Sequence, residues 1–395
     1  MVLAAGVDTA TSVALAEIGG MLLALGVFAY LAVRLKISVV PIYLGIGLAL
    51  GNGGIAPLDF SEDFLAIGAQ LGAILLLLML GLEHSGPNLV EGFLERKATG
   101  IIDVAVNGVP GAIVGFLLGW GPIGALALGG ITYVSSSGIA SQMLKEFGWN
   151  RSEISRRVTT VLVIEDLALA PYLPLLATLV AGLGVLAGVI SVAVALVVTA
   201  IALVISFKGE NAFSRVLNTN SQGALLLTVF GAALMAAGFS EMVGFSSAVA
   251  AFLVGLILPG EVAEAVRLRL SPLRDLFAAI FFVFFGLGVD PADIPAVLPL
   301  AFLLAVLGIA GKMFVGWFIA QGMSDSRAWM RAGAFLVPRG EFSILIAALA
   351  ASTLFGPFLQ ALTMAYVLIT SLAASLILRF LRSGLDRASS PATNR

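Results

Sequence analysis

The sequence contains no cysteine and only one histidine, His84. Disulfides and thiolate metal sites are therefore excluded, and a single histidine cannot build a metal cluster alone. Charge is also scarce: charged residues make up 11% of the chain, whereas soluble domains carry about 25%. The formal net charge of −2 favours no charged partner, and we expect neither a nucleic-acid partner nor a cofactor.

Long apolar runs make up most of the remaining sequence. The chain is 60% hydrophobic with a mean hydropathy of +1.08, and apolar runs of about 20 residues recur up to Arg379. They leave no room for a soluble domain, so we predict an all-α membrane protein with one transmembrane domain over residues 1–395 and no soluble regulatory domain. The first run lacks a basic start and a cleavage site, and we interpret it as a retained helix.

Charged residues and Pro/Gly breaks divide the apolar runs into about thirteen predicted transmembrane helices. They fall near residues 12–33, 37–51, 62–82, 98–120, 122–147, 153–180, 182–207, 220–238, 241–259, 271–289, 294–321, 328–353 and 357–382. The second is the shortest of them.

The charged residues outside these segments sort by side of the membrane. If the N-terminus is outside, every Lys and Arg except Lys312 and Arg339, which is 19 of the 21, falls on the cytoplasmic side. The external loops carry acids only: Asp8, Asp59, Glu62, Asp63, Glu241, Asp290 and Asp293. Because basic residues favour the cytoplasmic side, we predict an odd number of spans in the cell inner membrane, with the C-terminus in the cytoplasm.

Two predicted segments are poor helices at their centres. The fifth reads "LALGGITYVSSSGIASQML" and the twelfth "AGAFLVPRGEFSILIA", with Pro338 and Gly340 about halfway. They are the fifth and the twelfth segments, seven crossings apart. Because successive spans alternate in direction, two segments separated by an odd number of crossings run in opposite directions through the membrane. This pattern predicts two inverted six-helix repeats, segments 1–6 and 8–13, whose interrupted helices mark a transporter's binding site at mid-membrane depth.

Seven charged residues fall within the predicted spans: Glu17, Asp103, Glu165, Asp166, Lys312, Arg339 and Glu341. Each costs about 2.5–3.5 kcal/mol on insertion scales, so such residues indicate function by default. Glu165 and Asp166 lie in mid-segment, where a side chain cannot easily reach the interface. Asp103 lies near the inner end of its segment; we expect it to be able to reach water, and we keep it as a possible accessory residue.

The remaining buried charges each have a local explanation. Lys312 is the lysine at a depth comparable to that of the two acids and is their natural counter-ion, although such a pair can be purely structural. Pro338 should end the first half of the twelfth segment and leave carbonyls near Arg339. Glu341 would then begin the second half, where free N–H groups favour an anion. Stabilisation of the break is the simpler interpretation for both charges, and gating or ion contact is the alternative.

A carboxylate at mid-membrane is costly to leave bare, so it takes up either a proton or a dehydrated cation. Competition between these two ligands is sufficient for exchange, provided that the empty site crosses the membrane much less readily than the loaded one. The first broken segment would complete an oxygen shell for a monovalent ion with its freed carbonyls and hydroxyls, from Thr132, Ser135, Ser136 and Ser137.

At these residues the sequence resembles the monovalent cation:proton antiporters, in the bacterial branch that contains the glutathione-gated potassium efflux systems and the sodium/proton antiporters. The likeness covers essentially the whole chain. It is carried by "LMLGLEHSGPNL", "YVSSSGIASQML", "IEDLALAP", "GFSSAVAAFLVGLIL", "FFVFFGLGVD", "GK" in the eleventh segment and "PRGEFSILIA".

The resemblance implies a homodimer in which a mobile core with crossed broken helices, about residues 87–180 and 294–382, moves against a dimerisation scaffold. Asp166 matches the family's aspartate that binds the cation and carries the proton, and Lys312 matches the lysine that pairs with the preceding acid. Glu165 is a departure, since this position is Asp in electrogenic sodium/proton members and Gln in potassium efflux members. We expect no nucleotide-binding regulatory domain like that of the efflux systems, and a separate regulatory subunit could take its role.

Two other functions fit a membrane protein with buried acids. A potassium channel-like efflux protein would share the ion ligands but not the coupling to protons. An intramembrane aspartyl protease needs two carboxylates that share a proton, but adjacent residues on a helix project about 100° apart. Oxygen ligands suit both sodium and potassium, so both are candidate cargo.

Overall fold

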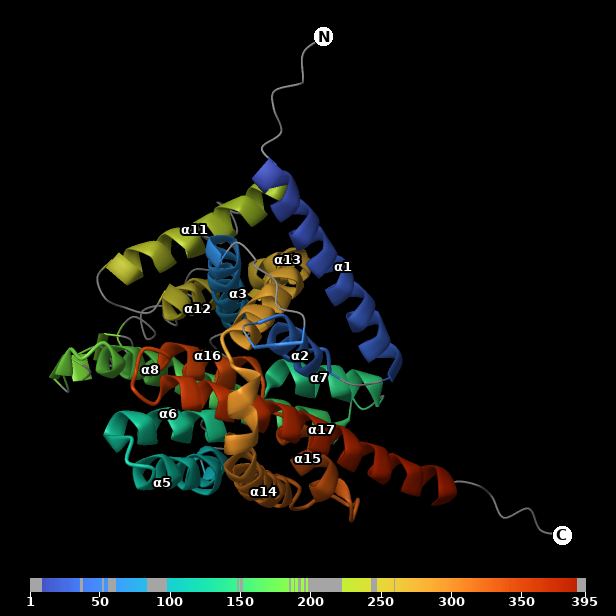
Figure 1. The fold of residues 1–395 in the computed structure, drawn as a ribbon. Coiled ribbons are helices and arrows are strands. Elements are labelled where there is room, and N and C mark those ends of the chain that lie inside the picture. Colours follow the sequence, from blue (N-terminus) through green and yellow to red (C-terminus); the bar gives the residue numbers. More distant parts are fainter. Residues whose placement is uncertain are drawn as a thin grey trace.

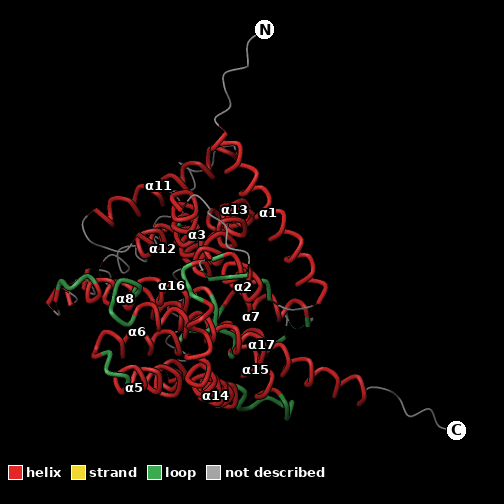
Figure 2. The backbone as a smooth tube through the Cα atoms, in the orientation of Figure 1, coloured by secondary structure: helices red, strands yellow, loops and turns green. Residues whose placement is uncertain are grey.

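The computed structural model describes residues 9–35, 38–51, 53–55, 62–83, 98–147, 149, 152–184, 186–187, 189–190, 193–194, 197, 222–242, 247–258 and 260–388. Within these ranges the regular elements are all helical and no strand occurs (Figure 2), which confirms the all-α prediction. His84 lies outside the described residues, as does most of the predicted segment at 182–207.

The helices match the predicted segments within a few residues at most ends. They are α1 (Thr9–Leu35), α2 (Val40–Leu50), α3 (Glu62–Glu83), η1 (Val104–Gly108), α5 (Val109–Leu117), α6 (Gly121–Tyr133), α7 (Ser137–Glu146), α8 (Glu153–Val180), α11 (Gln222–Met242), α12 (Ser247–Ile257), α13 (Gly260–Leu287), η2 (Pro291–Asp293), α14 (Ile294–Ile319), α15 (Ala328–Leu336), α16 (Glu341–Leu349) and α17 (Gly356–Ala388). Across the described part of the chain, 8 spans are long and apolar enough to cross a membrane, and three shorter apolar helices accompany them. The number thirteen stays a prediction.

The start of the tenth predicted segment, 271–289, is wrong, because α13 already begins at Gly260. The added turns bury Ala263, Val266 and Leu270, whose spacing of three and four residues puts them on one face. Arg267 points to the other side, with 37% of its side chain exposed. Hydropathy averages over both faces, so it misses an amphipathic extension of a membrane helix.

Three hydrophobic clusters organise the described helices, and the smallest joins α1 to the second half of α13 through Met21, Leu25 and Ile280. The core cluster contains the buried side chains of α6, α8 and α14 to α17. The scaffold cluster contains side chains of α3, α11, α12 and the first half of α13, although Leu77 of α3 and Phe252 of α12 belong to the core cluster. In Figure 1 α3, α12 and α13 lie together in the upper half, and α5, α6, α14 and α15 lie in the lower half. The second half of α13 connects the clusters, since Leu270 belongs to the scaffold cluster and Phe281 to the core cluster.

Both predicted helix interruptions are present. The fifth span is divided into α6 and α7 by three residues between Tyr133 and Ser137, and the twelfth into α15 and α16 by four residues between Leu336 and Glu341. The second break includes Pro338, which has no N–H to continue a helical ladder. Both breaks lie in the protein interior, where neighbouring groups can satisfy the freed backbone.

Glycine allows very close packing where α14 meets α15. A Cβ added at Gly316 would overlap the backbone of Gly333 and the carbonyl of Trp329, which cannot move aside as a flexible side chain can. By contrast, a Cβ at Gly231, in the middle of α11, would meet nothing within 4 Å. Small residues of this kind let membrane helices approach closely.

We therefore expect Gly316→Ala to destabilise the protein by about 1–3 kcal/mol, as overpacking typically does. Gly231→Ala is the matched control and should be neutral or stabilising by up to about 1 kcal/mol, since alanine is the better helix former. Thermal unfolding of the two purified variants in detergent measures the difference. Equal midpoints for both would contradict the close packing of α14 against α15.

Candidate ion-translocation site

The two helix breaks are bonded directly to each other. The Ser136 N–H donates to the Pro338 carbonyl at 2.8 Å, and the Ser135 hydroxyl donates to the Leu336 carbonyl at 2.8 Å. The Ser343 hydroxyl, on α16, also donates to a carbonyl of α6, that of Ile131, at 3.0 Å. Segments about two hundred residues apart in the sequence thus satisfy each other's exposed backbone.

Arg339 stabilises the carbonyl ends of both first half-helices. Its guanidinium donates to the carbonyls of Leu336 and Val337 at 3.0 and 2.9 Å, and to the carbonyl of Thr132 at 2.8 Å. The side chain is 0% exposed. Carbonyl ends of helices carry partial negative charge, so this buried cation is balanced by two helix ends. The expected contact with its own half-helix is present, and the contact with Thr132 adds a second.

Glu341 is the first residue of α16, as the sequence predicted, but its carboxylate bonds to the other broken helix. It accepts a hydrogen bond from the Ser136 hydroxyl at 2.6 Å and one from the Gly138 N–H, near the start of α7, at 3.2 Å. The anion therefore lies at the amino ends of both second half-helices, where partial positive charge favours it. Arg339 thus bonds to the carbonyl ends of α6 and α15, and Glu341 bonds to the start of α7 while lying in the first turn of α16.

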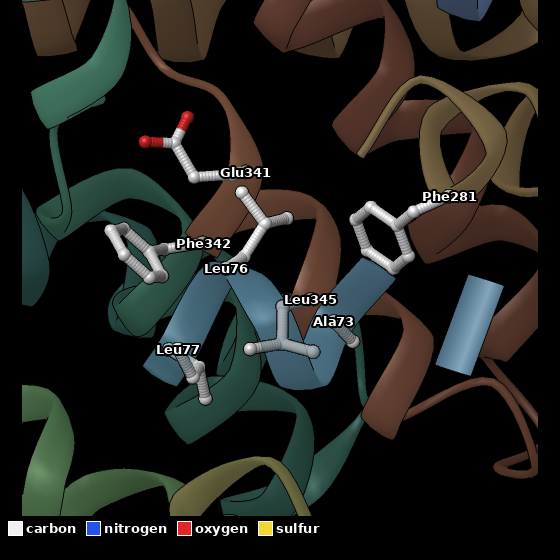
Figure 3. Close-up of a pocket in the computed structure, with 7 residues that line it drawn as sticks. All are labelled: Ala73, Leu76, Leu77, Phe281, Glu341, Phe342 and Leu345. Carbon is white, nitrogen blue, oxygen red and sulfur yellow. The ribbon is translucent and has the colours of Figure 1, made fainter. Parts of the chain in front are cut away.

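A small apolar cavity lies beside this carboxylate. Its lining comes from α3 (Ala73, Leu76 and Leu77), from α13 (Phe281) and from α16 (Glu341, Phe342 and Leu345). Figure 3 shows the Glu341 carboxylate directed away from Phe281 and Leu77, which agrees with its bonds to Ser136 and Gly138. The cavity therefore marks an apolar contact between α16 of the core cluster and the helices α3 and α13.

The last helix, α17, supports the second break with polar side chains that the sequence analysis did not single out. The Thr370 hydroxyl accepts from the Arg339 N–H at 3.4 Å, and the Ser371 hydroxyl donates to the Arg339 carbonyl at 3.1 Å. The Arg339 guanidinium lies 5.8 Å from the ring centroid of Tyr366. In the sequence these residues look like ordinary small or aromatic residues of an apolar helix, so no signal marked them.

The adjacent acids of α8 are both buried. Glu165 is 1% exposed and Asp166 is 2% exposed, so neither faces lipid. Glu165 accepts a hydrogen bond from the Ser135 N–H, and its other oxygen lies 3.1 Å from the Ser135 hydroxyl, which places its carboxylate at the first break. α8 itself begins at a Ser152 cap, whose side chain accepts from the Ser155 N–H.

Lys312, in the middle of α14, joins two carboxylates from different helices. Its ammonium donates to both oxygens of Asp103, at 2.7 and 2.9 Å, and to one oxygen of Glu165 at 3.0 Å. Asp103 and Lys312 are 0% exposed. The ammonium also lies 5.6 Å from the ring centroid of Tyr133. Asp103, Glu165 and Lys312 therefore form a buried ionic cluster between α14 and the first break.

The expectation that Asp103 reaches water is wrong. The residue precedes η1, a π-helical turn in which the Val109 N–H bonds to the Val104 carbonyl five residues back. Pro110 follows, and it cannot donate to the carbonyl four residues earlier. Asn107, on the same turn, donates to Asp103 at 2.7 Å. The turn directs Asp103 toward α14, and hydropathy carries no information about such a local change of helix type.

The predicted oxygen shell around the first break is largely occupied by hydrogen bonds within the protein. The Thr132 hydroxyl donates to the Asn107 carbonyl at 2.8 Å, and its carbonyl accepts from Arg339. The hydroxyls of Ser135 and Ser136 donate to Leu336 and Glu341, as described above. Ser137 begins α7 and is partly buried. Both oxygens of Thr132 are thus engaged within the protein in this structure, and its role in ion binding stays a prediction.

Comparison with known proteins identifies the family. The model of the family described as "Sodium/hydrogen exchanger, transmembrane" matches residues 20–383. The chain is 30% identical over 375 residues to the Ammonium/H(+) antiporter subunit AmhT of Alkalihalophilus pseudofirmus, covering 92% of each chain. It is 27% identical over 372 residues to the K(+)/H(+) antiporter subunit KhtU of Bacillus subtilis, covering 91% of this chain and 92% of that protein.

Two further similarities extend this result. The glutathione-regulated potassium-efflux system protein KefC of Klebsiella pneumoniae is 30% identical over 374 residues, which cover 91% of this chain and 59% of that longer protein. The fold matches that of the sodium proton antiporter MjNhaP1 from Methanocaldococcus jannaschii, with a TM-score of 0.66 at 17% identity over 93% of this chain and 99% of that one. This chain is therefore a membrane protein of the sodium/hydrogen exchanger family, the cation:proton antiporters.

Proposed function

We propose that this protein exchanges a monovalent cation for protons by alternating access, and that cation and proton compete for Asp166. The observation that carries the proposal is the buried acid pair of α8 at the crossing of two interrupted helices, in a chain of this family. A carboxylate held in a low-dielectric site is stable when it carries either a proton or a cation. Each ligand must therefore leave before the other can bind.

The surrounding charges favour a cation at this place. Asp103, Glu165, Asp166 and Lys312 have a summed formal charge of −2 when all are ionised, from three acids and one base. Arg339 and Glu341 carry opposite charges and are held by the ends of the half-helices. The carboxylates thus outnumber the bases around the crossing. One bound cation or proton reduces the excess negative charge of the site. This explains why the loaded site would cross the membrane more readily than the empty one.

We also propose that a mobile core moves against a scaffold within this chain. We place the mobile core at about residues 87–180 and 294–382 and assign the remaining helices to a scaffold that also forms a homodimer. α16 meets α3 and α13 through the apolar side chains that line the small cavity. Apolar contacts have no directional bonds to break, so the core can slide past the scaffold at low cost.

The relatives suggest the cargo and a partner. KhtU and KefC are named for potassium, MjNhaP1 for sodium and AmhT for ammonium. We propose sodium or potassium as the exchanged cation. KhtU and AmhT are both named as subunits, which supports a separate regulatory subunit for this chain as well. We place the protein in the cell inner membrane with its N-terminus outside and its C-terminus in the cytoplasm.

Flux in proteoliposomes tests this function. Addition of sodium or potassium to vesicles that contain the protein and a pH-sensitive dye should change the lumenal pH in proportion to cation flux, and choline should not. The same measurement with and without a clamped membrane potential determines the charge moved per cycle. Cation flux far above antiporter turnover with no matching proton movement would indicate a channel and overturn the proposal.

A further inference from the structure

Lys312 is bound more fully by Asp103 than by the acid of the α8 pair. Both Asp103 oxygens lie within 2.9 Å of the ammonium, while Glu165 offers one oxygen at 3.0 Å. All three side chains are 0–1% exposed, so water does not screen these charges. The lysine that faces the proposed ion site therefore has its main counter-ion outside that site.

The local structure holds Asp103 in this position. Asn107 donates to Asp103 through its side chain and accepts the Thr132 hydroxyl through its backbone, so η1 is tied to the first broken helix. On α14, a Cβ at Gly311 would lie 2.5 Å from the Asn107 side-chain oxygen and 2.9 Å from the Val106 carbonyl. A glycine next to Lys312 thus allows η1 to approach α14 closely enough for the ionic contact.

We propose that Asp103 is a positioning residue that holds Lys312 and neutralises its charge, so that Glu165 keeps its own negative charge for the cation bound at Asp166. This inference rests on the proposed function. Without Asp103, the ammonium would have Glu165 as its carboxylate partner in the cluster, and the ion site would lose one unit of negative charge. Cation affinity, rather than the maximal rate, is the quantity that Asp103 controls.

The charges of the cluster lead to a specific comparison. Asp103→Asn changes the formal charge of the four groups from −2 to −1, and Asp103→Asn combined with Lys312→Met returns it to −2. The single variant also leaves Lys312 without its main partner, whereas the double variant removes both members of the pair. A role in charge compensation therefore predicts that the half-saturating concentration rises in the single variant and recovers in the double variant, whereas a purely structural ion pair changes the yield and thermal stability but not the half-saturating concentration.

The experiment measures exchange in proteoliposomes as a function of cation concentration. The pH is set high enough that a further rise no longer lowers the half-saturating concentration, so that competing protons do not contribute. We expect Asp103→Asn to raise the half-saturating concentration at least tenfold, because at an effective dielectric constant of about 20 a unit charge within about 12 Å contributes the free energy of a tenfold change or more. The double variant should return to within about threefold of the unmodified protein.

Glu241→Gln is the matched control, because it also converts an acid to an amide but affects a carboxylate that pairs with Gln70 on α3, away from the cluster. It should leave the half-saturating concentration unchanged. If Asp103→Asn lowers only the yield or the maximal rate, or if the double variant stays as weak as the single one, the inference is wrong. These outcomes differ from a failure of the proposed function, in which the unmodified protein itself shows no cation-dependent proton movement.

Discussion

Asp166→Asn is expected to abolish cation-dependent proton movement and reduce it to the level of empty vesicles. Asparagine keeps the size of aspartate but can neither ionise nor carry a proton, so the two competing ligands lose their common site. The residue is 2% exposed, and bulk water cannot replace the missing carboxylate. Flux measured with the dye assay, on protein that elutes as the same species in size-exclusion chromatography, tests this result.

Glu165→Gln is the matched control for this variant, because it makes the same chemical change at the neighbouring residue. Its carboxylate contacts Lys312 and Ser135, so we expect a lower cation affinity or a different charge per cycle, with exchange retained. Normal exchange in the Asp166→Asn protein would refute the mechanism. Complete loss in both variants would instead show that the pair acts as one unit.

Lys312→Met is expected to destabilise the fold by about 3–5 kcal/mol, the usual cost of removing one partner from a buried ion pair. Asp103 and Glu165 would be left as buried carboxylates without the ammonium that donates to both. Neither can turn to water, because the exposed fraction of each side chain is at most 1%. Thermal unfolding in detergent should therefore show a markedly lower midpoint than for the unmodified protein.

Arg274→Met supplies the comparison for an exposed ion pair. Arg274 contacts Asp275 at 2.7 Å, but 67% of the Asp275 side chain is exposed. Surface pairs of this kind contribute about 0–1 kcal/mol, so the midpoint should change little. Lys312→Met combined with Asp103→Asn should be more stable than Lys312→Met alone, since one of the two uncompensated charges is gone. A Lys312→Met protein as stable as the unmodified one would contradict the ionic cluster.

Much of the fold follows from local sequence properties. Hydropathy located the spans, because a membrane helix must bury an apolar stretch of roughly the bilayer's thickness. The serine-rich and Pro/Gly interruptions located the breaks between Tyr133 and Ser137 and between Leu336 and Glu341, because these residues disfavour a continuous helix. The start of α13 was missed for the complementary reason: an amphipathic turn with Arg267 has low mean hydropathy although it is helical.

The partners of the buried charges could be predicted only in part. Arg339 was expected beside the carbonyls of its own half-helix, and it does contact Leu336 and Val337. Its bond to Thr132 and the bonds of Glu341 to Ser136 and Gly138 join segments more than two hundred residues apart. No local pattern specifies such pairs, because they depend on how the two broken helices cross.

Asp103 is the residue for which tertiary structure changed the interpretation most. Its position near a segment end indicated access to water, whereas a π-helical turn directs it onto Lys312 of a helix 209 residues away. The sequence by itself determined the membrane class, the spans, the two interruptions and the presence of buried acids, because each depends on residue type over one or two turns. Only the tertiary structure decided which charged side chains form ion pairs. These pairs depend on the distances between packed helices, and the membrane interior cannot solvate a charge that is left unpaired.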